Sequence, residues 1–249
     1  MLAYPSLPSL EALTDYLEAR YAALGLKTRR LRFSYQGLPQ SDLIAVIPGS
    51  LPPEKNRPVL LADHIDTAFA EDVFKASGQR RSVPGADDNA VATAALLEAA
   101  SVLKDSKPKH DLWLVHLTGE EYPADDLGAR ALIRELLAER RLLTGVIIMD
   151  MIGYREPGDP VFQLSAGEGR AAERLARAAD LAARREAPGL SPRLRGRFDP
   201  ESYLYNTDGL IFSEAGYPVL LVNEHLNAGF NLERRHYHES TDVSERLDF

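Results

Sequence analysis

The chain has 249 residues, 45% of them hydrophobic, and its 37 acidic and 29 basic side chains give a formal net charge of −8. A chain of this length and composition can bury one sizeable core, so we predict a single domain spanning residues 1–249. The absence of cysteine excludes disulfides, thiolate metal ligands and a thiol nucleophile. The negative net charge argues against nucleic acid as the main partner, because phosphate groups bind to basic surfaces.

Targeting and membrane signals are missing from the sequence. No apolar stretch approaches the roughly 18 residues that a membrane span needs. Met1–Pro5 lacks the charged start and apolar centre of a secretory signal. We therefore expect a cytoplasmic protein without a membrane partner.

The first third of the chain predicts a helix followed by an antiparallel hairpin. Apolar residues fall on one stripe between Leu10 and Leu24, with Ser9 as a cap and Gly25 as a stop. Apolar and polar residues alternate over 31–35, which is the period of a half-exposed strand, and 43–47 is its expected partner. Residues 48–58 contain four prolines and predict a loop.

The rest of the chain alternates apolar strands with helices, which favours right-handed crossovers and parallel strands. Residues 188–200 are rich in Pro, Gly and Arg and predict an irregular excursion. The pattern indicates a three-layer α/β/α sandwich with a mixed, mostly parallel central sheet. The expected strands are 59–62, 112–117, 146–150 and 218–222, and the expected helices are about 89–103, about 128–139 and 171–185.

Three of the apolar runs end in residues of the types that commonly bind metal ions in proteins. His64 and Asp66 follow the first, Glu120 and Glu121 the second, and Asp150 the third. The carboxyl ends of parallel strands form the crevice where open α/β sheets bind ligands, so these side chains should converge. A carboxylate two residues from a ligating histidine is well placed to orient the imidazole. Asp150 would be costly to bury without a cation or strong hydrogen bonds.

Each of these residues also has a structural interpretation. His64 could be a core histidine, Glu120-Glu121 a solvated turn, and Asp87 or Asp88 a helix cap. The loop of residues 122–126, which is acidic through Asp125 and Asp126, could attract a substrate's free amine or simply be solvated. We assign structural or surface roles to the other histidines, which are His110, His116, His225 and His236.

Five ordered motifs, HIDT, PGADDN, GEE, MDMIGY and YHESTD, span about residues 58–242. In this set and order the chain resembles metallopeptidase family twenty-eight, the two-zinc aminopeptidases of the zinc-dependent exopeptidase superfamily. The resemblance implies a zinc-exopeptidase fold, a cis peptide bond after Asp88 and two divalent ions. One ion would be held by His64 and Asp150, the other by Glu121 and His238, and Asp88 would bridge them. Asp66 would support His64.

The resemblance also implies a reaction. Zn²⁺ is the expected metal, and Mn²⁺ or Co²⁺ would fit the same ligands. A hydroxide bridging the metals would attack a peptide carbonyl, with Glu120 as general base and Tyr237 helping to polarise the carbonyl. The expected substrate is a peptide or a small aminoacyl compound. One alternative is a single-zinc glutaminyl cyclase, which is an acyltransferase, and another is a catalytically silent binding module; the complete ligand set argues against both. A dipeptidase or carboxypeptidase of the same superfamily is a further alternative.

Family members usually continue beyond the position of Phe249 into a long closing helix. Without that helix one face of the sheet would be uncovered, which leaves open both a homo-oligomer, in which a second subunit covers that face, and a truncated chain.

Overall fold

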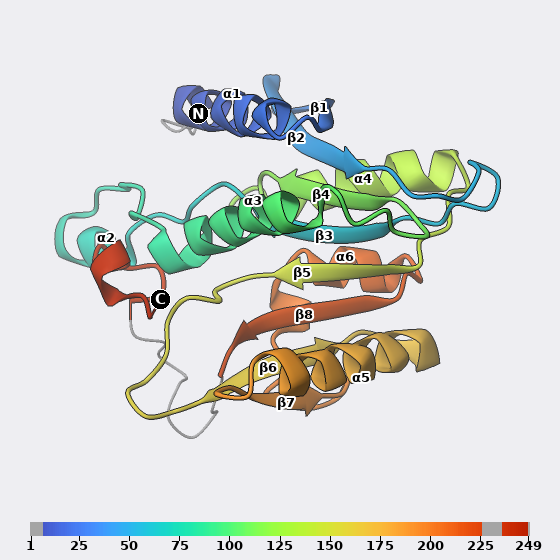
Figure 1. The fold of residues 1–249 in the computed structure, drawn as a ribbon. Coiled ribbons are helices and arrows are strands. Elements are labelled where there is room, and N and C mark those ends of the chain that lie inside the picture. Colours follow the sequence, from blue (N-terminus) through green and yellow to red (C-terminus); the bar gives the residue numbers. More distant parts are fainter. Residues whose placement is uncertain (1–6, 226–235, 249) are drawn as a thin grey trace.

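An eight-stranded mixed sheet with the order β1-β2-β4-β3-β5-β8-β6-β7 forms the centre of the computed structural model (Figure 1). The structure describes residues 7–225 and 236–248. Strand β3 pairs in parallel with β4 and β5, β5 with β8, and β6 with β7, and the remaining pairs are antiparallel. The strands are β1 (Lys27–Tyr35), β2 (Leu38–Ile47), β3 (Val59–His64), β4 (Leu112–Leu117), β5 (Gly145–Met149), β6 (Val161–Ala166), β7 (Ser191–Arg195) and β8 (Val219–Glu224).

Helices cover both faces of this sheet, which confirms the three-layer architecture. Helices α1, α3 and α5 pack on one face, and α4 and α6 pack on the other. A short helix, α2, lies near the carboxyl end of β3 (Figure 1). The helices are α1 (Leu7–Ala23), α2 (Glu71–Ser77), α3 (Val91–Leu103), α4 (Leu127–Ala138), α5 (Gly169–Glu186) and α6 (Gly209–Glu214), with short helical turns η1 (Ala86–Ala90), η2 (Leu204–Asn206) and η3 (Ser244–Arg246).

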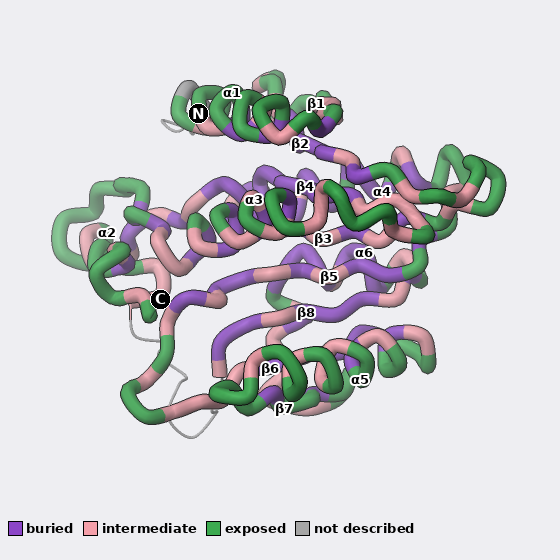
Figure 2. The backbone as a smooth tube through the Cα atoms, viewed as in Figure 1, coloured by how far each residue is buried: buried purple, intermediate pink, exposed green. Residues whose placement is uncertain are grey.

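The core lies on either side of the sheet because the central strands are apolar on both faces. On one side, Leu17 and Tyr21 of α1 pack with Leu96 of α3 against the sheet. On the other side, Leu132 of α4 and Phe212 of α6 pack against β3, β4, β5 and β8. Buried segments run through the middle of the molecule in Figure 2. Within the described ranges, no helix has the length and apolar character to cross a membrane.

Most elements lie within two residues of their expected bounds, and the expected antiparallel hairpin at the edge is β1 with β2. One expectation was wrong. Residues 188–200 contain strand β7, which pairs only with β6 at the sheet edge, where a proline such as Pro192 is tolerated. Strand β6 and helix α2 were not anticipated either. Met1–Pro5, on which the expectation about targeting rests, lies outside the described residues.

Candidate metal centre

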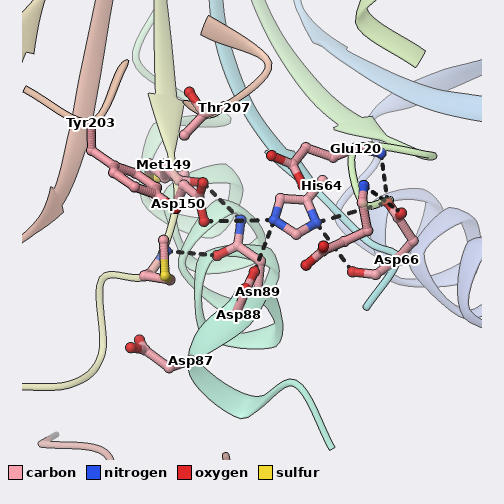
Figure 3. A network of polar contacts seen from close by, with 12 residues as sticks. His64, Asp66, Asp87, Asp88, Asn89, Glu120, Met149, Asp150, Tyr203 and Thr207 are labelled. Carbon is pink, nitrogen blue, oxygen red and sulfur yellow. Dashed lines mark hydrogen bonds and ion pairs between the residues drawn. The ribbon is translucent and has the colours of Figure 1, made fainter. Parts of the chain in front are cut away.

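Three parallel strands deliver acidic and histidine side chains to one end of the sheet. His64 is the last residue of β3, Asp150 follows β5 directly, and Glu120 and Glu121 follow β4 after a two-residue gap. Because β3 pairs in parallel with both β4 and β5, the carboxyl ends of these three strands lie together at the same end of the sheet. His64 and Asp150 are each only 2% exposed. Figure 3 shows their side chains pointing toward one another.

Asp88 connects the two histidines that were expected to bind metal. Its Oδ1 lies 3.1 Å from His64 Nε2, and its Oδ2 lies 3.3 Å from His238 Nε2. The carboxylate thus offers one oxygen to each histidine, which is the arrangement a bridging ligand needs. The peptide bond between Asp88 and Asn89 is cis, which confirms the expectation made for it.

The structure gathers the candidate residues into two groups, with the ligand atoms of each within 4.8 Å of one another. Glu121 Oε1 lies 3.2 Å from His238 Nε2, and Asp150 Oδ1 lies 3.6 Å from His64 Nε2. Glu120 lies among the ligand atoms of the His64 group, although the sequence suggested a proton-transfer role for it. The groups are His64, Glu120 and Asp150, and Asp88, Glu121 and His238.

The polar atoms of this centre are suited to cations. His64 Nε2, Asp150 Oδ1 and Glu121 Oε1 are fully buried atoms, and their close neighbours among the described residues are charged groups of the same centre. Buried charges are normally paired or bind metals. Imidazole and carboxylate ligands together suit zinc. The donor set therefore fits two divalent ions, one for each group.

The pKa values of Glu120, Glu121 and His238 in this centre are shifted in the direction that favours the protonated forms of these side chains. Burial and the charge of Asp88 raise the pKa of Glu121 to about 7. Burial alone would lower the pKa of His238, but hydrogen bonds to Asp88 and Glu121 raise it to about 10. Burial also raises the pKa of Glu120 well above its usual value. Without an ion, the centre shares protons where a cation would otherwise balance its carboxylates.

Asp66 holds the loop that carries Glu120 and Glu121. Its carboxylate accepts hydrogen bonds from the backbone N–H groups of Gly119, Glu120 and Glu121 at 2.8, 3.2 and 3.1 Å. We expected this carboxylate to orient the imidazole of His64. Instead, His64 Nδ1 lies 3.1 Å from the Asp66 carbonyl oxygen and 3.8 Å from its Oδ1. Asp66 therefore contacts His64 chiefly through its backbone.

Asn89 attaches the Asp88 turn to the segment that carries Asp150. Its side-chain amide donates to the Met149 carbonyl at 2.9 Å, and its Oδ1 accepts from the Met151 N–H at 3.2 Å. These bonds hold the backbone in place on both sides of Asp150 (Figure 3). Sequence reasoning did not assign this role to Asn89, although it belongs to the PGADDN motif.

Asp87 makes a second attachment. Its Oδ1 accepts from the backbone N–H groups of Gly153 and Tyr154 at 2.7 and 3.2 Å. Neither Asp87 nor Asp88 caps a helix, because the N-caps of η1 and α3 are Gly85 and Ala90 and neither helix start has a side-chain cap.

Asp242 holds the same turn from the opposite side. Its carboxylate accepts from the N–H groups of Asp87 at 2.8 Å and Asp88 at 3.2 Å. The residue is 2% exposed and lies four positions after His238, so the motif YHESTD supplies both a candidate ligand and a support for Asp88. This role was also missed, because a lone acidic residue gives no signal of what it contacts.

Tyr237 lies beside the centre, stacked on His238 with 3.7 Å between the ring centroids. The Tyr203 hydroxyl donates to the Tyr237 hydroxyl at 3.1 Å. Burial, followed by the nearby Tyr203, raises the pKa of Tyr237 well above its usual value, so the phenol keeps its proton. Tyr203 precedes η2 and lies in none of the five motifs, so no sequence signal pointed to it.

The loop of residues 122–126 forms a tight turn that carries Asp125 and Asp126. Asp125 and Asp126 lie 3.6 and 3.8 Å from the Arg130 guanidinium, and the Asp126 side chain is buried at the start of α4. The charge of Asp126 is therefore directed at α4, whereas the Asp125 side chain is 83% exposed. Tyr122, the first residue of the turn, is 66% exposed.

The remaining histidines lie outside both groups. His116 is fully buried between Asp63, at 2.7 Å, and the Tyr21 hydroxyl, at 2.6 Å. His225 pairs with Asp159 at 2.5 Å. These contacts agree with the structural roles expected for them.

The chain is similar to a known family over most of its length. A model of peptidase family M28 matches residues 42–249. The uncharacterised protein YfbL of Escherichia coli strain K12 is 24% identical over 267 residues, which cover 98% of this chain and 76% of YfbL.

Solved structures share the fold at low sequence identity. The Legionella pneumophila aminopeptidase LapA superposes with a TM-score of 0.73 at 17% identity, over 96% of this chain and 60% of LapA. The chain thus spans less than two thirds of LapA. The Tannerella forsythia glutaminyl cyclase gives 0.74 at 21% identity, over 98% of this chain and 86% of the cyclase. A leucine aminopeptidase precursor from Bacteroides thetaiotaomicron gives 0.70 at 20% identity, over 96% of this chain and 82% of the precursor.

Proposed function

The chain belongs to peptidase family M28, and from that premise we propose that it is a metal-dependent aminopeptidase. It would use two divalent ions, with zinc as the expected metal, to remove N-terminal residues from peptides. The observation that carries the proposal is the position of Asp88 between the two histidines, with one oxygen directed at each. A shared carboxylate between two sets of buried nitrogen and oxygen atoms supports a pair of ions over a single one.

The ions, when bound, would polarise the substrate carbonyl and make the attacking water more acidic. His64, Asp150 and Asp88 would hold one of them, and Glu121, His238 and Asp88 the other. Glu120 is then left without a required ligand role.

Glu120 is the residue proposed to move the proton. It would take a proton from the attacking water and give it to the amine that leaves. Its buried position raises its pKa, which favours proton uptake. Asp66 fixes the backbone of the loop, so that Glu120 and Glu121 are held in different directions. The Tyr237 hydroxyl, which keeps its proton, would donate a hydrogen bond to the carbonyl oxygen.

Activity and metal content measured on the same zinc-loaded sample test the proposal. We expect release of single N-terminal residues from peptides and from aminoacyl p-nitroanilides, with up to two zinc ions bound per chain. N-blocked peptides should not be cleaved. Cleavage of N-blocked peptides would favour a carboxypeptidase, and cleavage limited to dipeptides would favour a dipeptidase.

A glutaminyl cyclase is the second candidate, because the Tannerella forsythia cyclase shares the fold over as large a part of its length as the leucine aminopeptidase precursor does. The same sample should be given a peptide with N-terminal glutamine. Loss of ammonia from that peptide, without release of an amino acid and with about one tightly bound zinc ion, would replace the aminopeptidase proposal with the cyclase.

A further inference from the structure

A hairpin-like segment between β3 and the Asp88 turn reaches the metal centre. Phe69 bridges to Ser82, and the Ala70 N–H donates to the Arg81 carbonyl at 2.6 Å, so the segment folds back on itself around α2. The first residue of α2, Glu71, donates its N–H to the His238 carbonyl at 2.8 Å. The segment therefore lies against the loop that supplies His238, as Figure 1 shows for α2 and the C-terminal segment.

Arg80 of this segment lies over three aromatic rings. Its guanidinium carbon is 5.2 Å from the ring centroid of Phe69, 5.7 Å from that of Phe74 and 5.9 Å from that of Tyr122. Phe69 and Phe74 also contact each other edge to face at 5.6 Å. We call these four residues the Arg80 cluster. It joins the segment to the loop of Glu121, because Tyr122 directly follows Glu121.

The exposed Arg80 guanidinium contacts the three rings, and it has no carboxylate or carbonyl partner among the described residues. The adjacent Arg81 instead bonds Gln79 Oε1 at 3.2 Å. Stacking on rings uses the face of a guanidinium and leaves its N–H edge free, which is the edge that binds carboxylates in bidentate fashion. Arg80 is exposed, as are Phe74 (40%) and Tyr122 (66%).

The cluster touches the loop beside which the leaving part of a substrate would lie, because Arg80 contacts Tyr122. In the proposed reaction Glu120 gives its proton to the leaving amine, so that amine lies next to the loop of residues 119–122. The acidic side chains of the centre would repel a carboxylate next to this loop. Arg80 supplies the positive charge that such a group needs.

We propose that the Arg80 cluster is the subsite for the leaving part of the substrate, and that Arg80 binds the terminal carboxylate of a short peptide while the rings contact its side chain. The preferred substrates are then free-acid peptides of two to four residues. This inference rests on the proposed aminopeptidase function, but it can fail while that function stands.

The test compares matched peptides that end in a free carboxylate or in a carboxamide. For the natural protein, we expect kcat/KM for the free-acid peptide to exceed that for the carboxamide by about tenfold or more at the best peptide length. This ratio corresponds to the free energy of one charge-assisted hydrogen bond. The Arg80→Gln variant should bring this ratio to about one. Arg80→Lys should keep part of the preference, because it retains the charge and loses the planar fork.

Arg81→Gln is the matched control, because Arg81 is equally exposed and lies outside the cluster. It should keep the ratio of the natural protein. A natural protein without a free-acid preference at any length, an Arg80→Gln variant that keeps the preference, or an Arg81→Gln variant that loses it would each overturn the proposal.

Binding measured without turnover separates the two proposals. Calorimetry on the zinc-loaded Glu120→Gln protein should give a lower Kd for the free acid than for the carboxamide, and the difference should shrink as salt is added. Equal Kd values would overturn the subsite even if peptides are cleaved. Tighter free-acid binding in a protein that releases no amino acid would support the subsite and reject the aminopeptidase.

Discussion

Glu120 and Glu121 are adjacent in the chain, yet their side chains join different groups of the metal centre. Adjacent residues in an extended segment point to opposite sides, and the three N–H bonds to Asp66 hold the backbone in place. Because one side chain is proposed to move protons and the other to bind an ion, substitutions at the two positions should have different effects.

Glu120→Gln should abolish turnover while the protein keeps its metal. Loss of a general base typically lowers the rate by about 10² to 10⁴, and the amide retains the shape of the acid. Steady-state kinetics and metal analysis of the same preparation check this. Near-normal activity in this variant would contradict the mechanism.

Glu121→Gln is the companion substitution and should weaken metal binding as well as activity, because it removes a charge from a ligand. If Glu120→Gln lost metal and Glu121→Gln kept it, the roles of the two acids would be reversed. That outcome would agree with the position of Glu120 among the ligand atoms of the His64 group.

The turn that carries Asp88 depends on an element far away in the sequence. Asp242 accepts hydrogen bonds from two consecutive N–H groups of this turn. Asp242→Ala should leave those groups without acceptors and let the bridging carboxylate move, although no ligand is removed. Loss of such a support typically lowers metal affinity about 10- to 100-fold.

Competition for zinc against a coloured chelator measures this change. Glu245→Ala is the control, because it removes an exposed carboxylate three residues later. Equal zinc affinity in Asp242→Ala and Glu245→Ala would show that the support is not needed.

Helix α4 offers a test of how the helices pack on the sheet. Leu132 is fully buried between α4 and the sheet, whereas Leu137 on the same helix is 55% exposed. Leu132→Ala should lower the free energy of unfolding by about 2–5 kcal/mol because it leaves a cavity. Leu137→Ala should change it by no more than about 0.5 kcal/mol. Urea unfolding of both variants compares the two, and similar losses would mean that α4 is placed incorrectly.

The sequence predicted those elements that carry a strong periodic pattern. The strands that supply His64 and Asp150 are continuous apolar runs, and the helices on the sheet show clear boundaries. Strand β7 was missed because Ser191-Pro192-Arg193-Leu194-Arg195 has the composition of a loop, and only its pairing with β6 makes it a strand. Edge strands are solvated on one side, so their sequences are less constrained.

The candidate ligands could be predicted from motifs, but most of their supports could not. Asn89 and Asp242 act through backbone groups whose positions depend on the whole fold. Tyr203 reaches Tyr237 from a segment without any motif. Contacts of this kind arise from tertiary structure and leave no mark on local spacing.

For the whole molecule, the charge of the centre makes stability depend on pH and on metal. Burial raises the pKa of Glu121 from its model-peptide value of 4.5 to about 7, so the ion-free fold binds more protons than the unfolded chain between these values and loses stability as pH rises. The pKa of His238 is raised from 6.5 to about 10, so its contribution is complete below 6.5 and is lost as pH rises toward 10.

The melting temperature of chelator-treated protein should therefore fall between about pH 5 and pH 9. Zinc binds the deprotonated ligands, so the rise in melting temperature on adding zinc should grow over the same range. Calorimetric scans with and without zinc check both trends. In Glu121→Gln the slope between about pH 5 and 7 should flatten, and a chelated natural protein that gains stability with rising pH would contradict the assignment.

The strand order has a consequence for how such proteins can diverge. Strands β4, β3 and β5 occupy the third, fourth and fifth places of the eight-stranded sheet. Their carboxyl ends are followed by or contain His64, Glu120, Glu121 and Asp150. Extra chain can be inserted at either margin without displacing them. The match to LapA covers 60% of that protein and the match to the Tannerella forsythia cyclase 86%, so relatives that share this fold differ greatly in size. A lineage that changes the length of its chain only at the margins of the sheet would therefore keep the candidate metal centre in place.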